Sequence, residues 1–206
     1  MAGEAAELLP PKPSLKSLRE AAADCKACPL WELGTQTVFG EGERTARLVL
    51  IGEQPGDAED VAGKPFVGPA GRLLDEALER AGLDRHFAYV TNVVKHFKWE
   101  PRGKRRIHKK PNEREITACR PWLAAELSVL EPEVIVCLGA TASQALLGRD
   151  FRVSLQRGIV MPSDLARHIM ATVHPSSILR ADDREHEMQA FVADLEKVSP
   201  LLAAYQ

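Results

Sequence analysis

Apolar runs a few residues long alternate with helical patterns along this chain, and no other feature of the sequence constrains the fold as strongly. Strands buried on both faces are expected at four of these runs, residues 47–53, 87–94, 134–138 and 169–173. Helices are expected from apolar spacing and capping patterns at residues 14–23, 73–81, 112–130, 140–147 and 184–198. Such alternation favours a parallel sheet covered by helices on both faces. The predicted fold is α/β, a three-layer α/β/α sandwich with a central, mainly parallel four-stranded sheet.

The length of the chain favours one domain. Its 206 residues suffice to bury a substantial core, and we expect a single domain over residues 15–206. Residues 1–14 contain three prolines and are expected to form a flexible N-terminal segment. This segment carries Glu4 and Glu7 and reads as neither a signal peptide nor a membrane span, and no later run reaches the roughly 18 apolar residues that a spanning helix needs. These observations predict a cytoplasmic protein.

Charge is distributed unevenly along the chain. The net charge is −2, so the overall balance does not indicate a nucleic-acid partner. Between residues 102 and 110, however, six of nine residues are Lys or Arg, and a seventh is His108. This segment is expected to form a loop, either a solvated charged surface or a local positive field that attracts an anion.

Polar residues lie where the predicted strands end, and ligands of parallel sheets bind at that edge. The strand ends carry Glu53, Asn92, Gly139 and His174. The turn at residues 52–57 supplies a carboxylate and free backbone N–H groups, and it matches neither a dinucleotide fingerprint nor a P-loop. A simple Gly/Pro turn is the alternative interpretation, as is a structural role for His174.

Two cysteines three positions apart, Cys25 and Cys28, have a spacing typical of iron or zinc ligands. A redox-active pair is the alternative, but that motif belongs between a strand and a helix, and this pair precedes every predicted strand. Cys119, early in a predicted helix, is a candidate third ligand. The fourth is His96 or Cys137, and Cys137 lies in an apolar strand where Cys is most often a small buried hydrophobe.

Four separated segments together resemble the family 4 uracil-DNA glycosylases. They are Gly52-Glu-Gln-Pro-Gly56, Gly63-Lys-Pro-Phe-Val-Gly-Pro-Ala-Gly71, Thr91-Asn-Val-Val-Lys95 and His174-Pro-Ser-Ser177. Cys25, Cys28 and Cys119 look like the iron–sulfur ligands of that family. The resemblance covers nearly everything from Cys25 to Arg180, in the family's order, and implies an enzyme that excises uracil from DNA.

Departures from family 4 resemble the UdgX group, which is similar to family 4 but becomes covalently attached to DNA where it excises uracil. His96 stands where family 4 carries a further Cys, a longer loop follows at residues 103–108, and Gln54 replaces a small residue. The resemblance leaves Cys137 in the core. It implies a four-iron, four-sulfur cluster (4Fe-4S) whose ligands are Cys25, Cys28, His96 and Cys119.

The resemblance also implies how uracil is recognised. Phe66 stacks on a base extruded from the helix, and the Asn92 amide matches O4 and N3–H of uracil but not the reversed pattern of cytosine. His174 donates to O2, where negative charge develops during cleavage. Gly52 belongs to the same uracil-binding set.

At the sugar, Glu53 is expected to stabilise the oxocarbenium-like cation or to activate the attacking group. His108 is expected to attack C1′ through a neutral imidazole nitrogen, in place of water. Gln54 and Asp57 are expected to support the site. Contacts with DNA are expected from the side chains of Lys104, Arg105, Arg106, Ser176, Ser177 and Arg180.

Two alternatives remain at this point. One is a conventional family 4 enzyme that turns over and does not use the basic loop in its chemistry. The other is a non-catalytic iron–sulfur or zinc module that binds DNA. The expected partner is uracil-containing DNA, single- or double-stranded, bound by a monomer without a membrane contact.

Overall fold

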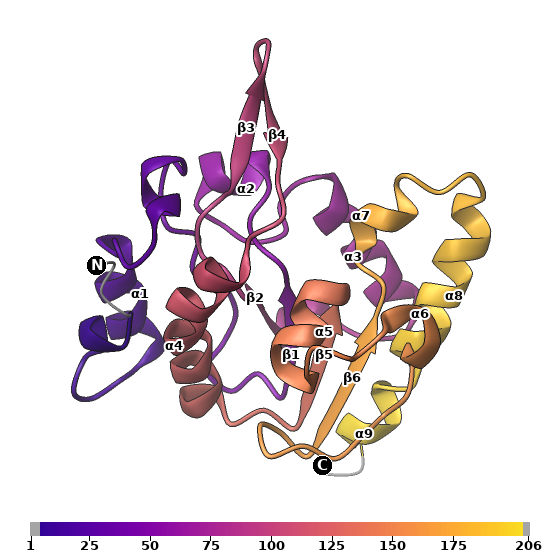
Figure 1. Cartoon of the computed structure of the whole chain (residues 1–206). Helices are drawn as coiled ribbons and strands as arrows, with labels where there is room; N and C mark the ends of the chain where they lie inside the picture. The colour runs from indigo at the N-terminus through magenta and orange to yellow at the C-terminus, as the bar shows by residue number, and fades with distance from the viewer. Residues whose placement is uncertain (1–4, 204–206) are drawn as a thin grey trace.

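The structure, a computed structural model, describes residues 5–203 and places four parallel strands in one central sheet (Figure 1). Their order across the sheet is β2 (Ala88–Asn92), β1 (Leu48–Gly52), β5 (Val134–Leu138) and β6 (His168–Thr172). Helices cover both faces of this sheet. The predicted three-layer α/β/α fold is confirmed, and every pairing within the sheet is parallel.

Two apolar cores lie on opposite faces of the sheet, because successive side chains of a strand point to opposite sides. Val49, Ile51 and Ile135 belong to the first core, and Leu50 and Val136 belong to the second. The main helices of the first core are α1 (Leu15–Ala23), α4 (Glu113–Leu130) and α5 (Ala140–Leu147). Those of the second core are α3 (Pro69–Arg80) and α8 (Arg184–Glu196).

Capping fixes where two of these helices begin, as the sequence predicted for α4. The side chain of Asn112 accepts a hydrogen bond from the backbone N–H of Glu115 (3.0 Å), and the Glu115 carboxylate accepts one from the Asn112 N–H (2.7 Å). Ser14 and Ser17 cap α1 in the same reciprocal way. Each pair satisfies two N–H groups that a helix start leaves without partners.

Short elements complete the connections. They are η1 (Ala5–Leu8), η2 (Pro29–Glu32), η3 (Arg85–Phe87), α6 (Val153–Gln156), α7 (Pro175–Ile178) and α9 (Ser199–Ala203). The second strand ends at Asn92, two residues earlier than expected, and the closing helix ends at Glu196.

Residues 54–69 are rich in Gly and Pro, a composition typical of a loop, yet they contain a helix, α2 (Asp57–Ala62). The Glu59 carboxylate accepts a hydrogen bond from the backbone N–H of Gly56 (3.1 Å), which starts the helix. Gly63 ends it in the left-handed conformation, with φ of 69°. The glycines that suggested a loop therefore stand at the two ends of a helix, where they favour its boundaries.

The expected basic loop is instead an antiparallel ribbon of β3 (Trp99–Arg102) and β4 (Arg105–His108). Gly103 lies in the turn with φ of 61°, a conformation that glycine adopts readily. The ribbon projects from the molecule beyond the carboxyl ends of the sheet (Figure 1). His108 is the last residue of this ribbon, paired with Trp99 at its base.

The N-terminal segment contacts the rest of the fold where it is described. Ala5 is fully buried in the first core, and η1 lies against α4. Residues 1–4 and 204–206 lie outside the described residues. The flexibility of residues 1–14 and the single domain over 15–206 stay predictions. Within residues 5–203, no helix combines the length and apolar character needed to cross a membrane.

Candidate functional site

A cavity of about 620 Å³ lies at the carboxyl ends of the strands. Glu53, Asn92, Gly139 and His174, the four residues predicted from the strand ends, all line it. Residues from the ribbon and the connecting segments complete the lining, among them Gln54, Phe66, His108, Thr141, Ser176 and Arg180. This volume suits a small organic ligand.

Asn92 presents a hydrogen-bond acceptor without a partner. The residue is 2% exposed, and its Oδ1 atom has no hydrogen bond within the described residues. A buried polar atom left unpaired costs about 1–3 kcal/mol. The position therefore favours a ligand that brings an N–H donor to Oδ1.

A flat ring can be accommodated beside Asn92 because of Phe66 and Gly52. Phe66 is buried, with its ring 5.8 Å from that of His174 at an interplanar angle of 32°. A Cβ atom on Gly52 would lie 2.4 Å from Asn92 Oδ1 and 2.7 Å from the Phe66 ring. Only glycine at this position allows both side chains to approach the end of β1.

The protonation state of His174 follows from its contacts. The backbone N–H of Ser176 donates to His174 Nδ1 (3.1 Å), so this nitrogen is the acceptor, and the Ser176 hydroxyl lies 2.8 Å from it. Burial, together with the charges of His108 and Arg180, lowers the pKa of His174 to about 4. At neutral pH the ring is therefore neutral, with its proton on Nε2 and available to donate to a ligand.

His108 and Glu53 face each other within the cavity. His108 Nε2 lies 3.4 Å from Glu53 Oε1, and the hydroxyl of Thr141 donates to the other carboxylate oxygen. The His108 side chain is 49% exposed, and its partial burial lowers the pKa of the ring; the Glu53 carboxylate opposes this effect, and Arg180 adds to it. A neutral imidazole beside a carboxylate is an arrangement suited to nucleophilic attack.

Gln54 holds the base of the ribbon next to Glu53. Its amide nitrogen donates to the backbone oxygens of Lys98 and Lys109, both at 3.1 Å, and its Oε1 accepts from the Lys98 N–H (3.3 Å). These contacts bridge the entry and exit of the ribbon. One side chain thereby fixes both ends of the segment that carries His108.

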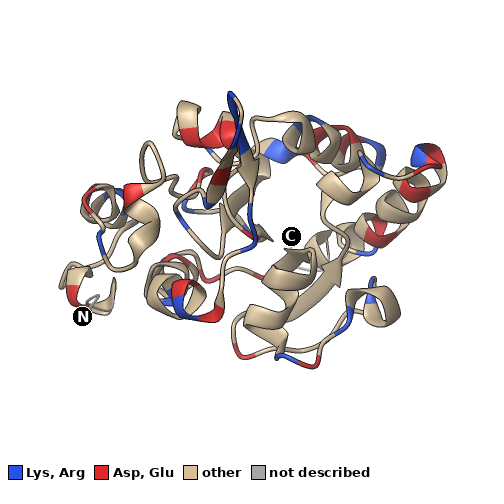
Figure 2. Ribbon diagram, turned by 45° about the horizontal axis from the view of Figure 1, so that its top comes forward, with Lys and Arg blue, Asp and Glu red and all other residues tan. Residues whose placement is uncertain are grey.

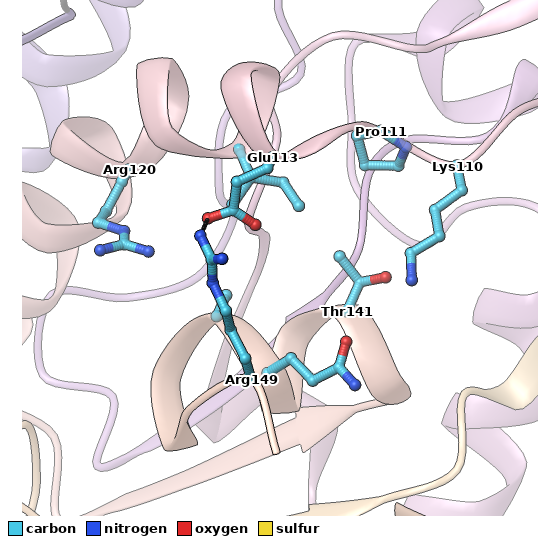
Figure 3. A pocket seen from close by; sticks show the side chains of 9 residues that line it. Lys110, Pro111, Glu113, Arg120, Thr141 and Arg149 are labelled. Atoms are coloured by element: carbon cyan, nitrogen blue, oxygen red, sulfur yellow. Dashed lines mark hydrogen bonds and ion pairs between the residues drawn. The ribbon is translucent and has the colours of Figure 1, made fainter. Parts of the chain in front are cut away.

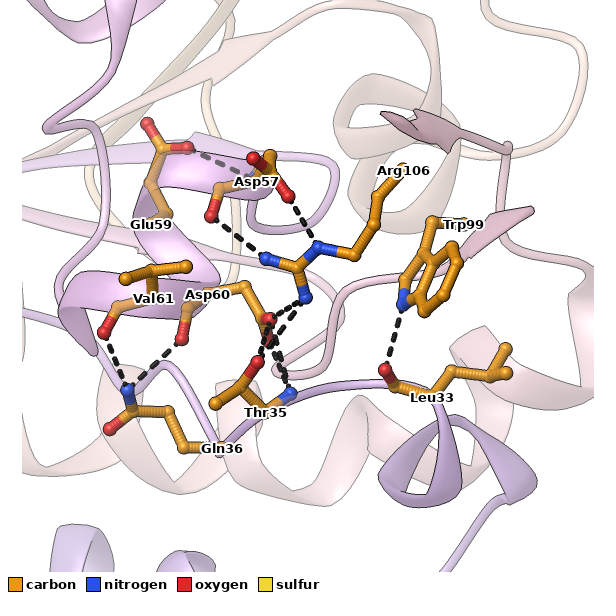
Figure 4. Close-up of polar contacts among 10 residues, drawn as sticks. Leu33, Thr35, Gln36, Asp57, Glu59, Asp60, Val61, Trp99 and Arg106 are labelled. Atoms are coloured by element: carbon orange, nitrogen blue, oxygen red, sulfur yellow. Dashed lines mark hydrogen bonds and ion pairs between the residues drawn. The ribbon is translucent and has the colours of Figure 1, made fainter. Parts of the chain in front are cut away.

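Arg106 holds the middle of the ribbon against α2 (Figure 4). Its guanidinium donates to Asp57 Oδ1 and Asp60 Oδ2, both at 2.5 Å, and lies over the rings of Phe97 and Trp99. Sequence reasoning expected Arg106 to contact DNA phosphates and Asp57 to support the site. In the structure Arg106 turns inward, and Asp57 is one of its two carboxylate partners.

Lys104 and Arg105 remain exposed at the turn of the ribbon, where basic residues gather (Figure 2). Of the other residues expected to contact DNA, Ser176 and Arg180 line the cavity. Ser177 is exposed, and its hydroxyl donates to the backbone oxygen of His174 (2.7 Å).

Three cysteines predicted as metal ligands lie near one another, and the fourth cysteine lies apart. Burial raises the pKa of Cys119 to about 12, and the charges of Cys28 and Cys25 act in the same direction. Cys119 and Cys25 each accept a hydrogen bond, from the Lys95 N–H (3.2 Å) and from the Trp122 ring N–H (3.3 Å). For Cys137, burial is the cause that raises the pKa to about 12, and the charges of the other cysteines do not contribute.

His96 has the protonation state of a nitrogen ligand. Thr37 donates its one hydroxyl hydrogen to the backbone oxygen of Ala22 (2.8 Å), so it accepts from His96 Nε2 at 3.0 Å. His96 Nδ1 then keeps its lone pair, and burial lowers the pKa of the ring. Within residues 5–203, no group of three or more His, Cys, Asp or Glu side chains is arranged to hold a single metal ion. Cysteine sulfurs that accept hydrogen bonds from N–H groups suit an iron–sulfur cluster, whose ligands are spaced around several metal and sulfide atoms and not around one ion.

Thr141 is a site residue that sequence reasoning did not identify. It lies in the first turn of α5, two residues after Gly139, and orients the Glu53 carboxylate. The available signal was a hydroxyl three residues after the end of β5, in the first turn of the helix that follows.

Comparison with known proteins agrees with this geometry. Residues 39–196 match the Uracil DNA glycosylase superfamily. The chain is 36% identical over 190 residues to the Type-4 uracil-DNA glycosylase of Thermotoga maritima, covering 91% of this chain and 94% of that protein. It is 36% identical over 188 residues to the Type-4 enzyme of Pyrobaculum aerophilum (87% and 91% covered) and 33% identical over 200 residues to that of Archaeoglobus fulgidus (94% and 96% covered).

Proposed function

Because the chain belongs to the uracil-DNA glycosylase superfamily, we propose that it excises uracil from DNA and then stays attached to the abasic deoxyribose through His108. The observation that carries the covalent step is the contact between His108 and Glu53 inside the cavity. Gln54 and Arg106 tie the ribbon that carries His108 to the rest of the fold. A ribbon anchored in this way suits a reacting group better than a solvated charged surface.

Uracil recognition rests on three side chains. A uracil that has left the base stack would place N3–H against Asn92 Oδ1 and fill its unmet acceptor. The Asn92 amide N–H would then donate to O4, Phe66 would stack on the ring, and His174 Nε2–H would donate to O2. Cytosine presents no N3–H, so its binding would leave Oδ1 unpaired and is disfavoured.

The bonds and protons of the proposed reaction balance, and the reaction needs no further reactant. The bond between C1′ and N1 of uracil breaks, and its electron pair leaves with the base, whose negative charge at O2 is stabilised by His174. Glu53 stabilises the cationic sugar. A lone pair of the neutral His108 imidazole then forms a C1′–N bond, the ring loses its remaining N–H proton beside Glu53, and the uracil anion gains one proton.

A conventional glycosylase that turns over is the second candidate. Glu53 alone, with one oxygen oriented by Thr141, would equally suit the activation of a water molecule. In that reading His108 takes no part in the chemistry. The relatives named above support uracil excision in both readings.

Incubation with uracil-containing single-stranded DNA, followed by a denaturing gel and an assay for free uracil, separates these functions. We expect uracil release together with a shifted band that survives heat and SDS, with at most one uracil released per protein. Uracil release with many turnovers and no shifted band would identify the conventional enzyme. No release at all would exclude both.

The cysteine-rich region is proposed to hold a 4Fe-4S cluster through Cys25, Cys28, His96 and Cys119. The support is the burial and mutual influence of the three thiols, their N–H donors and the free Nδ1 of His96. When bound, such a cluster would crosslink the N-terminal segment to α4. Its role is then structural.

Replacing Cys119 with Ser is expected to remove the cluster. Iron content should fall from about four atoms per chain to a small fraction, with loss of the brown absorbance near ~400 nm. Cys137→Ala is the matched control, because Cys137 lies in the core of β5 and should keep the iron. Zinc in place of iron in the purified protein would contradict the cluster assignment.

Replacing Arg106 with Gln is expected to slow adduct formation on the order of tenfold, because small misplacements of a reacting group reduce rates strongly. Uracil release under single-turnover conditions should fall less, since Asn92 and His174 do not depend on the ribbon. Arg105→Gln removes the same charge from an exposed position and should leave the adduct rate at saturating DNA nearly unchanged. Equal effects of the two substitutions would show that Arg106 acts through charge alone.

A further inference from the structure

A second cavity, of about 240 Å³, lies between the start of α4 and the helix α5 (Figure 3). Charged and polar side chains line most of it, and Thr141 among them also orients Glu53 in the first cavity. They include Lys110, Glu113, Arg120, Thr141, Gln144 and Arg149. Lys110 comes directly after the ribbon and its exit, so this cavity follows the His108 segment along the chain.

The charge of this cavity is positive. Three cations and one carboxylate line it, a balance of 3 − 1 = +2, in a chain whose net charge is −2. Arg149 donates to Glu113 Oε1 (2.8 Å). Within the described residues, the Lys110 ammonium and the Arg120 guanidinium have neither a hydrogen bond nor an ion pair. These two cations are therefore available to an anion.

The second cavity adjoins the first. Lys110 and Thr141 line both, and the Thr141 hydroxyl donates to Glu53 at the centre of the first cavity. A chain-like ligand with one unit in the first cavity can therefore pass over Thr141 and enter the second. A ligand with one anionic group per unit matches the cations there.

We propose that this second cavity binds a backbone phosphate of the DNA strand, next to the nucleotide whose base is excised. This inference rests on the proposed function, since it takes the first cavity as the place of the extruded nucleotide. Lys110 and Arg120 bind the phosphodiester oxygens, and Arg149 contributes once its contact with Glu113 is shared. Contacts of this kind fix the register of a strand without reading its sequence.

Arg120→Gln is the direct test, and Arg114→Gln is its matched control. Arg114 is an exposed arginine of the same helix that does not line the cavity. Affinity is measured by fluorescence anisotropy at several salt concentrations, with an oligonucleotide that carries thymine in place of uracil. We expect Arg120→Gln to weaken binding several-fold and to reduce the salt slope by about one, as for one lost phosphate contact. Arg114→Gln should change the slope less.

Glu113→Gln is expected to have the opposite effect on DNA affinity. Removal of this carboxylate frees Arg149 and raises the positive charge of the cavity, so DNA binding should tighten several-fold and the salt slope should steepen. A general effect of net charge would instead make Arg114→Gln as damaging as Arg120→Gln, and that outcome overturns the proposal. So does an unchanged DNA affinity of Arg120→Gln, even where inorganic phosphate binds the protein.

Two short substrates, one with uracil at the 5′ end and one with uracil at the 3′ end, test on which side of the extruded nucleotide the bound phosphate lies. The Arg120→Gln effect should persist with one substrate and vanish with the other, because only one has a phosphate at the second cavity. Equal effects of Arg120→Gln with both substrates overturn the placement of the phosphate in the second cavity. Since the thymine oligonucleotide needs no excision, failure of uracil release with a normal Arg120→Gln effect would reject the proposed function and not the phosphate site.

Discussion

Replacing His108 with Ser is expected to abolish the heat- and SDS-resistant DNA adduct while uracil is still released. Serine removes the imidazole that is proposed to bond to C1′ and leaves room for water beside Glu53. Water would then complete the reaction, and the product would dissociate. The variant should release more than one uracil per protein, which the wild type cannot do if each molecule is consumed by its own reaction.

The measurement combines the denaturing gel with a time course of uracil release at excess DNA. His86→Ser is the matched control, since His86 is an exposed residue of η3 that does not line the cavity. It should form the adduct at the wild-type rate. An adduct that persists in His108→Ser would falsify the assignment of the covalent bond to this residue.

Replacing Glu126 with Leu is expected to destabilise the protein by about 3–5 kcal/mol, which corresponds to a fall in Tm of roughly 10 °C. The Glu126 carboxylate is fully buried beneath β2 and pairs with the equally buried Lys95 ammonium. It also accepts hydrogen bonds from Tyr89 (2.8 Å), Thr91 (3.0 Å) and the Gly40 N–H (3.2 Å). Leucine would leave a buried cation and three donors without their acceptor.

The double variant Lys95→Met and Glu126→Leu separates the charge effect from packing. Removing both charges of a buried pair is far less destabilising than removing one, so the double variant should recover much of the lost stability. Thermal or denaturant unfolding measures both variants. A loss below about 1 kcal/mol for Glu126→Leu would show that the pair does not stabilise the fold. The Lys95 ammonium also donates to the backbone oxygen of Asn92 (2.9 Å), so the single variant should weaken uracil binding as well.

The edge of the sheet that carries the site could be predicted from the sequence. Glu53, Asn92 and His174 lie at the carboxyl ends of three different strands, and parallel strands bring these ends to one edge whatever the lengths of the connections. The strands themselves are recognisable because burial on both faces requires continuous apolar runs. Their convergence on one cavity is therefore a consequence of topology.

The orientation of Arg106 could not be predicted in this way. A run of basic residues does not indicate which member turns inward, and the answer depends on Asp57 and Asp60 in α2. The sequence did not predict that helix, because Gly56 and Gly63 at its ends are typical of a loop. The pairing of Lys95 with Glu126 depends on how α4 lies against β2, which local periodicity does not determine.

The unpaired oxygen of Asn92 also links recognition to folding. Without its ligand, the protein carries a buried acceptor whose hydrogen bond is missing, and its native state is less stable by about 1–3 kcal/mol than a satisfied core would be. An apolar side chain there would favour the fold and eliminate the complement to N3–H, a trade between stability and activity. The protein thus keeps, at the carboxyl end of β2, a buried acceptor whose missing hydrogen bond uracil is proposed to supply.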